Sequence, residues 1–119
     1  MKKVLIVDDA MVMRMMLRDI LEKNGFEVVG EAKDGLEGEK LYLELKPDVV
    51  TMDISMPQCD GIQAVKLIKK NDPGAKIIMI SALGQKEQVL EAIKSGAKDF
   101  IVKPFDETNV LNTIKRITQ

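Results

Sequence analysis

The sequence contains no histidine, no tryptophan and only one cysteine, Cys59. A single cysteine excludes an internal disulfide and leaves the usual cysteine spacings of metal sites unmet. The lack of histidine removes the commonest general base of enzymes and the commonest zinc ligand. A disulfide-stabilised fold and chemistry that depends on histidine are therefore excluded.

Charge of one sign is not in excess either. The 18 Lys and Arg residues are balanced by 19 Asp and Glu residues, which argues against binding nucleic acid or a membrane surface through bulk charge. The apolar run at residues 4–7 stops at Asp8 and Asp9, too soon for a signal peptide. No stretch approaches the roughly 20 apolar residues that a membrane span needs. We therefore expect a cytoplasmic protein that binds neither nucleic acid nor membrane.

Short apolar runs alternate regularly with longer segments of helical periodicity. The apolar runs predict strands at residues 4–7, 26–30, 49–52, 77–80 and 100–102. The other segments predict helices at residues 13–24, 36–45, 62–70, 88–94 and 109–117, the last capped by Asp106 or Thr108. Strands that alternate with helices form a parallel sheet covered on both faces, and continuously apolar strands fit such a sheet. Residues 1–119 are therefore expected to form one α/β domain.

Polar side chains follow four of the predicted strands. Asp8 and Asp9 follow the first, Asp53 the third, Ser81 the fourth and Lys103 the fifth. In open parallel sheets, ligands bind beyond the carboxyl ends of the strands, near the point where strand order reverses. If these four strands lie side by side, three acids, a hydroxyl and an ammonium group converge on one rim.

Three neighbouring carboxylates repel one another strongly. One pair about 4 Å apart costs roughly 4 kcal/mol at an effective dielectric constant of about 20. Raised pKa values, a bound cation, or both must offset this cost. Oxygen ligands in an open acidic pocket suit Mg²⁺, and an aspartate can attack phosphorus to give an acyl phosphate. A lysine and a hydroxyl are suitable partners for phosphoryl oxygens, so these residues indicate Mg²⁺-dependent phosphoryl transfer.

Several motifs in the sequence resemble those of bacterial response-regulator receiver domains. They are Val7-Asp8-Asp9, Met52-Asp53-Ile54-Ser55-Met56-Pro57, Gly61, Ile80-Ser81-Ala82, Gly96-Ala97-Lys98-Asp99-Phe100 and Lys103-Pro104-Phe105. Each motif alone is weak evidence, but together and in this order they are highly specific and cover essentially the whole chain. The resemblance implies a three-layer, flavodoxin-like doubly wound fold with strand order 2-1-3-4-5.

The same resemblance implies a role for each acid of the predicted rim. Asp53 would be the phosphoacceptor. Asp9 and Asp53 would bind Mg²⁺ directly, together with the main-chain carbonyl of Ser55. Asp8 would contribute mostly through water. Lys103 would bridge to a phosphoryl oxygen, and the bond to its following proline would be cis far more often than the 5–6% found for X-Pro bonds generally.

The resemblance also implies a conformational switch. Ser81 would hydrogen-bond the phosphoryl group, and Phe100 would turn inward as Ser81 moves. The signal would reach a face formed by the fourth helix, the fifth strand and the fifth helix. Many relatives have tyrosine at the position of Phe100, whose hydrogen bond phenylalanine cannot make, so plain core packing of Phe100 is the alternative.

We therefore expect a phosphorylation switch and not a turnover enzyme. The resemblance implies a histidine kinase as phosphoryl donor, a phosphatase as a further partner, and a monomer. Chemotaxis output to the flagellar motor switch is favoured. The alternatives are a phosphorelay intermediate, a receiver of another output pathway and a phosphate-independent interaction domain. A Mg²⁺ phosphatase of the haloacid dehalogenase type is disfavoured, because Ser55 stands where such enzymes carry a second acid.

Two further features lie outside these motifs. Helical spacing predicts that at least two of Met11, Met13, Met15 and Met16 are core residues, with an adaptable partner surface as the alternative. Leu83, two residues after Ser81, replaces the polar or acidic residue found in chemotaxis relatives. We expect it to shield an acyl phosphate from water.

Overall fold

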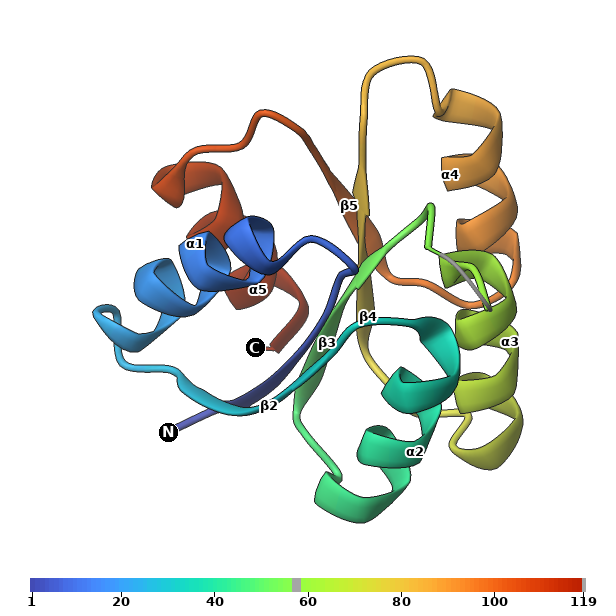
Figure 1. Ribbon diagram of the computed structural model, residues 1–119, viewed down its shortest axis with the longest axis horizontal. Helices are drawn as coiled ribbons and strands as arrows, with labels where there is room; N and C mark the ends of the chain where they lie inside the picture. Colours follow the sequence, from blue (N-terminus) through green and yellow to red (C-terminus); the bar gives the residue numbers. More distant parts are fainter. Residues whose placement is uncertain (57–58, 119) are drawn as a thin grey trace.

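The computed structural model describes residues 1–56 and 59–118 and contains all the predicted strands and helices (Figure 1). The strands are β1 (Lys3–Val7), β2 (Glu27–Ala32), β3 (Val49–Asp53), β4 (Ile77–Ser81) and β5 (Asp99–Val102). The helices are α1 (Met11–Glu22), α2 (Gly35–Leu45), α3 (Gly61–Asn71), α4 (Lys86–Lys94) and α5 (Glu107–Thr118). All five of these helices begin one or two residues before their predicted starts. None of the helices in the described ranges is long and apolar enough to cross a membrane.

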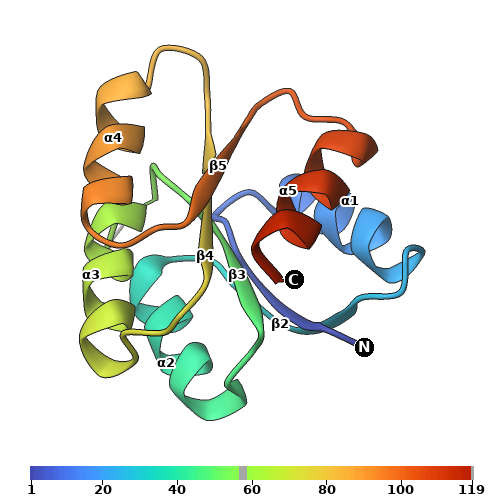
Figure 2. The same ribbon diagram turned by 180° about the vertical axis from the view of Figure 1, so that it is seen from behind.

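The five strands form one parallel sheet in the order β2-β1-β3-β4-β5, which confirms the predicted fold class. Helices α2, α3 and α4 cover one face, and α1 and α5 cover the other (Figures 1 and 2). Val7 pairs with Met52, and Asp53 pairs with Ile80. This register brings the carboxyl ends of β1, β3 and β4 to one edge of the sheet.

The core has two layers, one on each face of the sheet. Leu5 and Val7 belong to the cluster under α2, α3 and α4, whereas Val4 and Ile6 belong to the cluster under α1 and α5. This alternation follows from the two-residue period of a strand. Every residue of β3 and β4 is buried, as expected for central strands of a parallel sheet. Burying each large aliphatic side chain contributes about 1.5–3 kcal/mol, so the central strands are a stable base for the groups at their ends.

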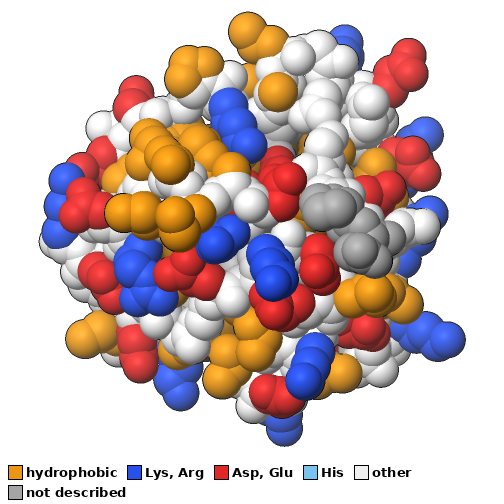
Figure 3. Space-filling view, viewed as in Figure 1, with side chains coloured by type: hydrophobic (Ala, Val, Ile, Leu, Met, Phe, Trp, Pro, Cys, Tyr) orange, Lys and Arg blue, Asp and Glu red, His pale blue; other side chains and the backbone are white. Residues whose placement is uncertain are grey.

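The methionines of α1 do not lie where the sequence predicts. Leu17 and Leu21 bury the inner face of α1, whereas Met11, Met15 and Met16 are exposed. Met13 lies four residues before Leu17, on the same face, and is only partly buried. The prediction that at least two of the methionines are core residues is therefore wrong. The i, i+4 pair of leucines already fills the contact with the sheet, and hydrophobic side chains gather on the surface over α1 (Figure 3).

Side-chain caps specify where α2, α3 and α5 begin. Asp106 accepts a hydrogen bond from the Asn109 N–H at 2.7 Å, which confirms the predicted cap of α5. Asp60 forms a capping box with Gln63 at the start of α3. A Cβ atom at Gly61 would collide with the main-chain carbonyl of Asp53, so α3 can approach the end of β3 this closely only with glycine there. Residue 57 of the predicted motif lies outside the described residues.

Candidate functional site

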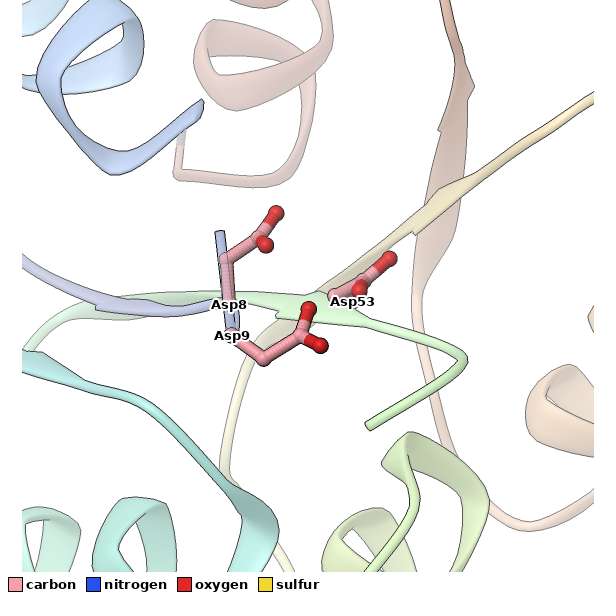
Figure 4. A group of neighbouring side chains, drawn as sticks. All are labelled: Asp8, Asp9 and Asp53. Atoms are coloured by element: carbon pink, nitrogen blue, oxygen red, sulfur yellow. The ribbon is translucent and has the colours of Figure 1, made fainter. Parts of the chain in front are cut away.

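Three carboxylates meet beyond the carboxyl ends of β1 and β3. Asp8 and Asp9 follow β1 directly, and Asp53 is the last residue of β3. Each contributes an oxygen to a group in which all three atoms lie within 4.8 Å of one another (Figure 4). The convergence of acids predicted from the strand ends is therefore present.

Two of these acids are removed from solvent. Asp8 is 1% exposed and Asp53 is 6% exposed, whereas Asp9 is exposed. Burial raises the pKa of Asp53 to about 6, with repulsion from Asp8 adding to the effect and Lys103 opposing it. Burial also raises the pKa of Asp8, although a hydrogen bond from the Ala10 N–H at 2.8 Å favours its charged form. Ionising these buried, closely spaced acids is therefore unfavourable, as expected from the sequence.

Lys103 is the cation that faces these acids among the described residues. Its Nζ lies 3.3 Å from Asp53 Oδ1 and 3.8 Å from Asp8 Oδ2. The Lys103–Pro104 peptide bond is cis. The Lys103 N–H donates to the Ser81 carbonyl at 2.7 Å, which joins the segment after β5 to the end of β4. One ammonium group does not balance three carboxylates, so the site retains an excess of negative charge.

The donor set fits a hard divalent cation. Asp8 Oδ2 is buried and has no hydrogen-bond partner among the described residues, a costly arrangement unless another ligand satisfies it. The group offers only oxygen ligands, and one of its acids, Asp9, opens to solvent. Mg²⁺ prefers oxygen ligands and keeps several of its waters, which an open acidic pocket of this kind allows.

The two predicted serines, Ser55 and Ser81, lie in the segments at the ends of β3 and β4. Ser81 is the last residue of β4, is 1% exposed, and follows Ile80, the residue that pairs with Asp53. Ser55 is exposed in the segment after β3, and its hydroxyl accepts a hydrogen bond from the side-chain amide of Gln85 at 2.9 Å. The carbonyl of Ser55 as a metal ligand stays a prediction.

Phe100 lies on β5 with 44% of its surface exposed. Its ring lines an apolar groove of about 280 Å³ together with Ser81, Leu83 and Val89. This exposure disagrees with plain core packing. The Phe100 side chain lies beside a groove that is also lined by Ser81, so it has space into which it could turn.

Two side chains that the sequence arguments missed also contact this region. The Arg14 guanidinium donates to the Asp8 carbonyl at 2.6 Å and pairs with Glu31 at 3.1 Å, which holds the start of α1 against β2. Gln85 connects the segments after β3 and β4. Neither residue belongs to the motifs, and a single glutamine before a helix carries no distinctive signal.

Comparison with known proteins places this fold and site in a class. The model of the response regulator receiver domain family matches residues 4–115, and the chain belongs to this family. It is therefore a receiver domain of two-component signalling.

Within that family the chain is close to the CheY chemotaxis regulators. The CheY protein of Thermotoga maritima is 58% identical over 118 residues, which cover 99% of this chain and 98% of that protein. The CheY protein of Bacillus subtilis is 58% identical over 114 residues, covering 96% and 95%. Among solved structures, the matching chain of the CheX-CheY-BeF3-Mg+2 complex from Borrelia burgdorferi is 39% identical, the match covers 99% of this chain and 90% of that one, and the TM-score is 0.95.

Proposed function

We propose that this protein is a phosphorylation-activated switch that accepts a phosphoryl group from a histidine kinase on Asp53. The observation that carries the proposal is the arrangement around Asp53, a buried carboxylate next to two further acids and 3.3 Å from Lys103. A carboxylate that attacks a phosphoryl group needs nearby positive charge to neutralise the phosphoryl oxygens, which Lys103 and a cation held by the acids would supply. Residues 1–119 form one receiver domain in this proposal, and its cytoplasmic location stays a prediction.

Asp53 attacks phosphorus through a carboxylate oxygen. A P–O bond forms to Asp53 as the P–N bond of the donor breaks; the electron pair of that bond stays on the donor's imidazole nitrogen, and the imidazole takes up a proton from solvent. With a pKa of about 6, Asp53 is mostly ionised at pH 7.5 and so ready to attack. Lys103 is placed to neutralise a phosphoryl oxygen. Asp8, Asp9, Asp53 and the Ser55 carbonyl would hold Mg²⁺, which when bound supplies further positive charge for the phosphoryl oxygens.

Phosphorylation then changes the shape of the output face. The phosphoryl group adds about −1.5 to −2 charges and three acceptor oxygens. Ser81 hydrogen-bonds to it, and Phe100 turns into the groove that it now borders. The receiving surface is formed by α4, β5 and α5, and its partner is the flagellar motor switch. The similarity to CheY proteins over nearly the full chain supports this output.

A separate surface borders the pocket on the side of α1. Met13 and Met16 line a groove of about 300 Å³ together with Lys103, Pro104 and Phe105. Exposed apolar side chains beside a reactive group are suited to a protein partner, and methionine adapts to different partner shapes. The donor kinase docks here in our proposal. A phosphatase is a further partner in this proposal, and the complex of CheX with CheY, BeF3 and Mg+2 from Borrelia burgdorferi supports a further protein partner of a similar chain.

The test is the intact mass of the protein after incubation with acetyl phosphate and Mg²⁺. We expect one phosphoryl adduct on the wild type, and none with Asp53→Asn or with EDTA in place of Mg²⁺. No adduct on the wild type would favour a phosphate-independent interaction domain. Chemotaxis output is tested separately, by whether beryllium fluoride and Mg²⁺ strengthen binding to a flagellar motor switch protein.

A further inference from the structure

Gln85 forms a bridge between two segments that flank Asp53. Its side-chain carbonyl accepts a hydrogen bond from the Ala82 N–H at 2.7 Å, and its side-chain NH₂ donates to the Ser55 hydroxyl at 2.9 Å. Ser55 lies two residues after Asp53, and Ala82 directly follows Ser81. One half-buried side chain therefore connects the end of β3 to the end of β4.

The position of Gln85 makes this use of its side chain unusual. It is the N-cap residue of α4, where a side chain ordinarily accepts a hydrogen bond from the first turn of the helix. Gln85 makes no such bond. Gly84 precedes it with φ of +89°, a turn that directs the chain so that Gln85 lies within reach of Ala82. The side chain points back to the pocket segments and leaves its own helix without a side-chain cap.

The bridge is placed where the proposed switch has to move. Ser81 is buried, and the main chain of the next residue, Ala82, is held by its hydrogen bond to the Gln85 side chain. Ser81, Gln85 and Phe100 line the same groove. A shift of the segment after β4 would therefore change both the Gln85 bridge and the space available to Phe100. A bond that ties this segment to Ser55 therefore favours the arrangement seen here.

We propose that Gln85 is a positioning residue that holds the segment after β4 in its resting position and releases Ala82 when Asp53 is phosphorylated. This inference rests on the proposed function, because it concerns the same site. The Ala82–Gln85 hydrogen bond is made in the resting form and lost in the phosphorylated form, so it opposes the switch. Its removal should strengthen binding of a phosphoryl analogue by about three- to tenfold.

The experiment is a titration of the protein with beryllium fluoride in the presence of Mg²⁺, with amide NMR signals as the readout. We compare wild type with Gln85→Ala, Ser55→Ala and the double variant. Gln88→Ala, an exposed glutamine in the first turn of α4, is the matched control. We expect Gln85→Ala to bind beryllium fluoride more tightly than wild type, and Ser55→Ala to show a smaller increase in affinity. The double variant should bind no more tightly than Gln85→Ala alone, and the control should bind as wild type does.

The outcomes separate the two proposals. A wild type that does not bind beryllium fluoride would overturn the proposed function. A wild type that binds, with Gln85→Ala binding equally or more weakly, would overturn only the role of Gln85. Hydrogen exchange of the Ala82 amide without beryllium fluoride gives an independent check, because Gln85→Ala should speed its exchange several-fold and Gln88→Ala should not.

Discussion

Asp53 and Asp72 lie at opposite ends of the sheet and show how differently one residue type is used. Asp53 ends β3, is buried among other acids, and has its pKa raised to about 6. Asp72 lies just before β4 and accepts hydrogen bonds from the Tyr42 hydroxyl at 2.6 Å and from the Gly74 N–H at 3.0 Å. These bonds, that from Tyr42 first, lower the pKa of Asp72.

The difference lies in how well each carboxylate is satisfied. Asp72 receives hydrogen bonds that favour its charge, so ionisation at neutral pH stabilises the fold. Asp53 is buried and lies next to Asp8, with a single ammonium group at 3.3 Å, so its ionisation costs stability. A carboxylate left in this state is ready to accept a cation or a phosphoryl group, whereas Asp72 is a structural acid.

The largest test of this comparison is Asp53→Asn in protein without Mg²⁺. A carboxyl whose pKa is raised from 3.8 to about 6 binds more protons in the folded state, so its contribution to stability falls as pH rises through that window. The asparagine variant avoids this cost. We expect it to be more stable than wild type by about 3 kcal/mol at pH 7.5 and equally stable near pH 3, below both pKa values, measured by urea unfolding in EDTA. A less stable variant at pH 7.5 would show that the bond to Lys103 outweighs the cost of burying the Asp53 charge and the repulsion from Asp8.

The fold was readable from the sequence because it depends on patterns that act locally. The apolar runs fix which segments are strands, and alternation with helices leaves the parallel sheet as the consistent arrangement. The predicted helix starts differ from the observed ones by one or two residues, because helix starts depend on caps and turns of only a few residues. The methionines of α1 were misplaced because periodicity shows that a helix has an apolar face but not which neighbours already fill the core, as Leu17 and Leu21 do here.

The candidate site was predictable to a similar depth. Asp8, Asp9, Asp53 and Lys103 follow strands whose carboxyl ends meet at one edge, so topology alone brings them together. The Gln85 bridge was not predictable, because it depends on a side-chain rotamer and on the path of two loops. Motifs identify groups that touch the ligand more readily than residues that position them.

Mg²⁺ should stabilise only the end of the sheet that carries Asp8, Asp9 and Asp53. A cation that binds the folded acids raises the free energy of unfolding by about 2.7 kcal/mol when its concentration is 100 times its dissociation constant. We expect urea unfolding in MgCl₂ and in EDTA to show this gain for wild type and most of it to vanish in Asp9→Asn. An equal gain in both proteins would place the cation elsewhere.

The smallest effect is expected at Asp72, the carboxylate that already accepts hydrogen bonds. Tyr42→Phe removes the hydroxyl that donates to Asp72 while keeping the buried ring, which is 5% exposed in tyrosine form. We expect a loss of about 0.5–1.5 kcal/mol at pH 7.5. Because the pKa of Asp72 is lowered, its contribution is complete above the ordinary aspartate pKa and is lost as pH falls through the lowered value, so the deficit should shrink in acid. Urea unfolding should show the same Mg²⁺ gain as wild type, since the acids at the other end are untouched. A Tyr42→Phe protein that lost its response to Mg²⁺ would mean that the two ends of the sheet are coupled and that Asp72 is more than a structural acid.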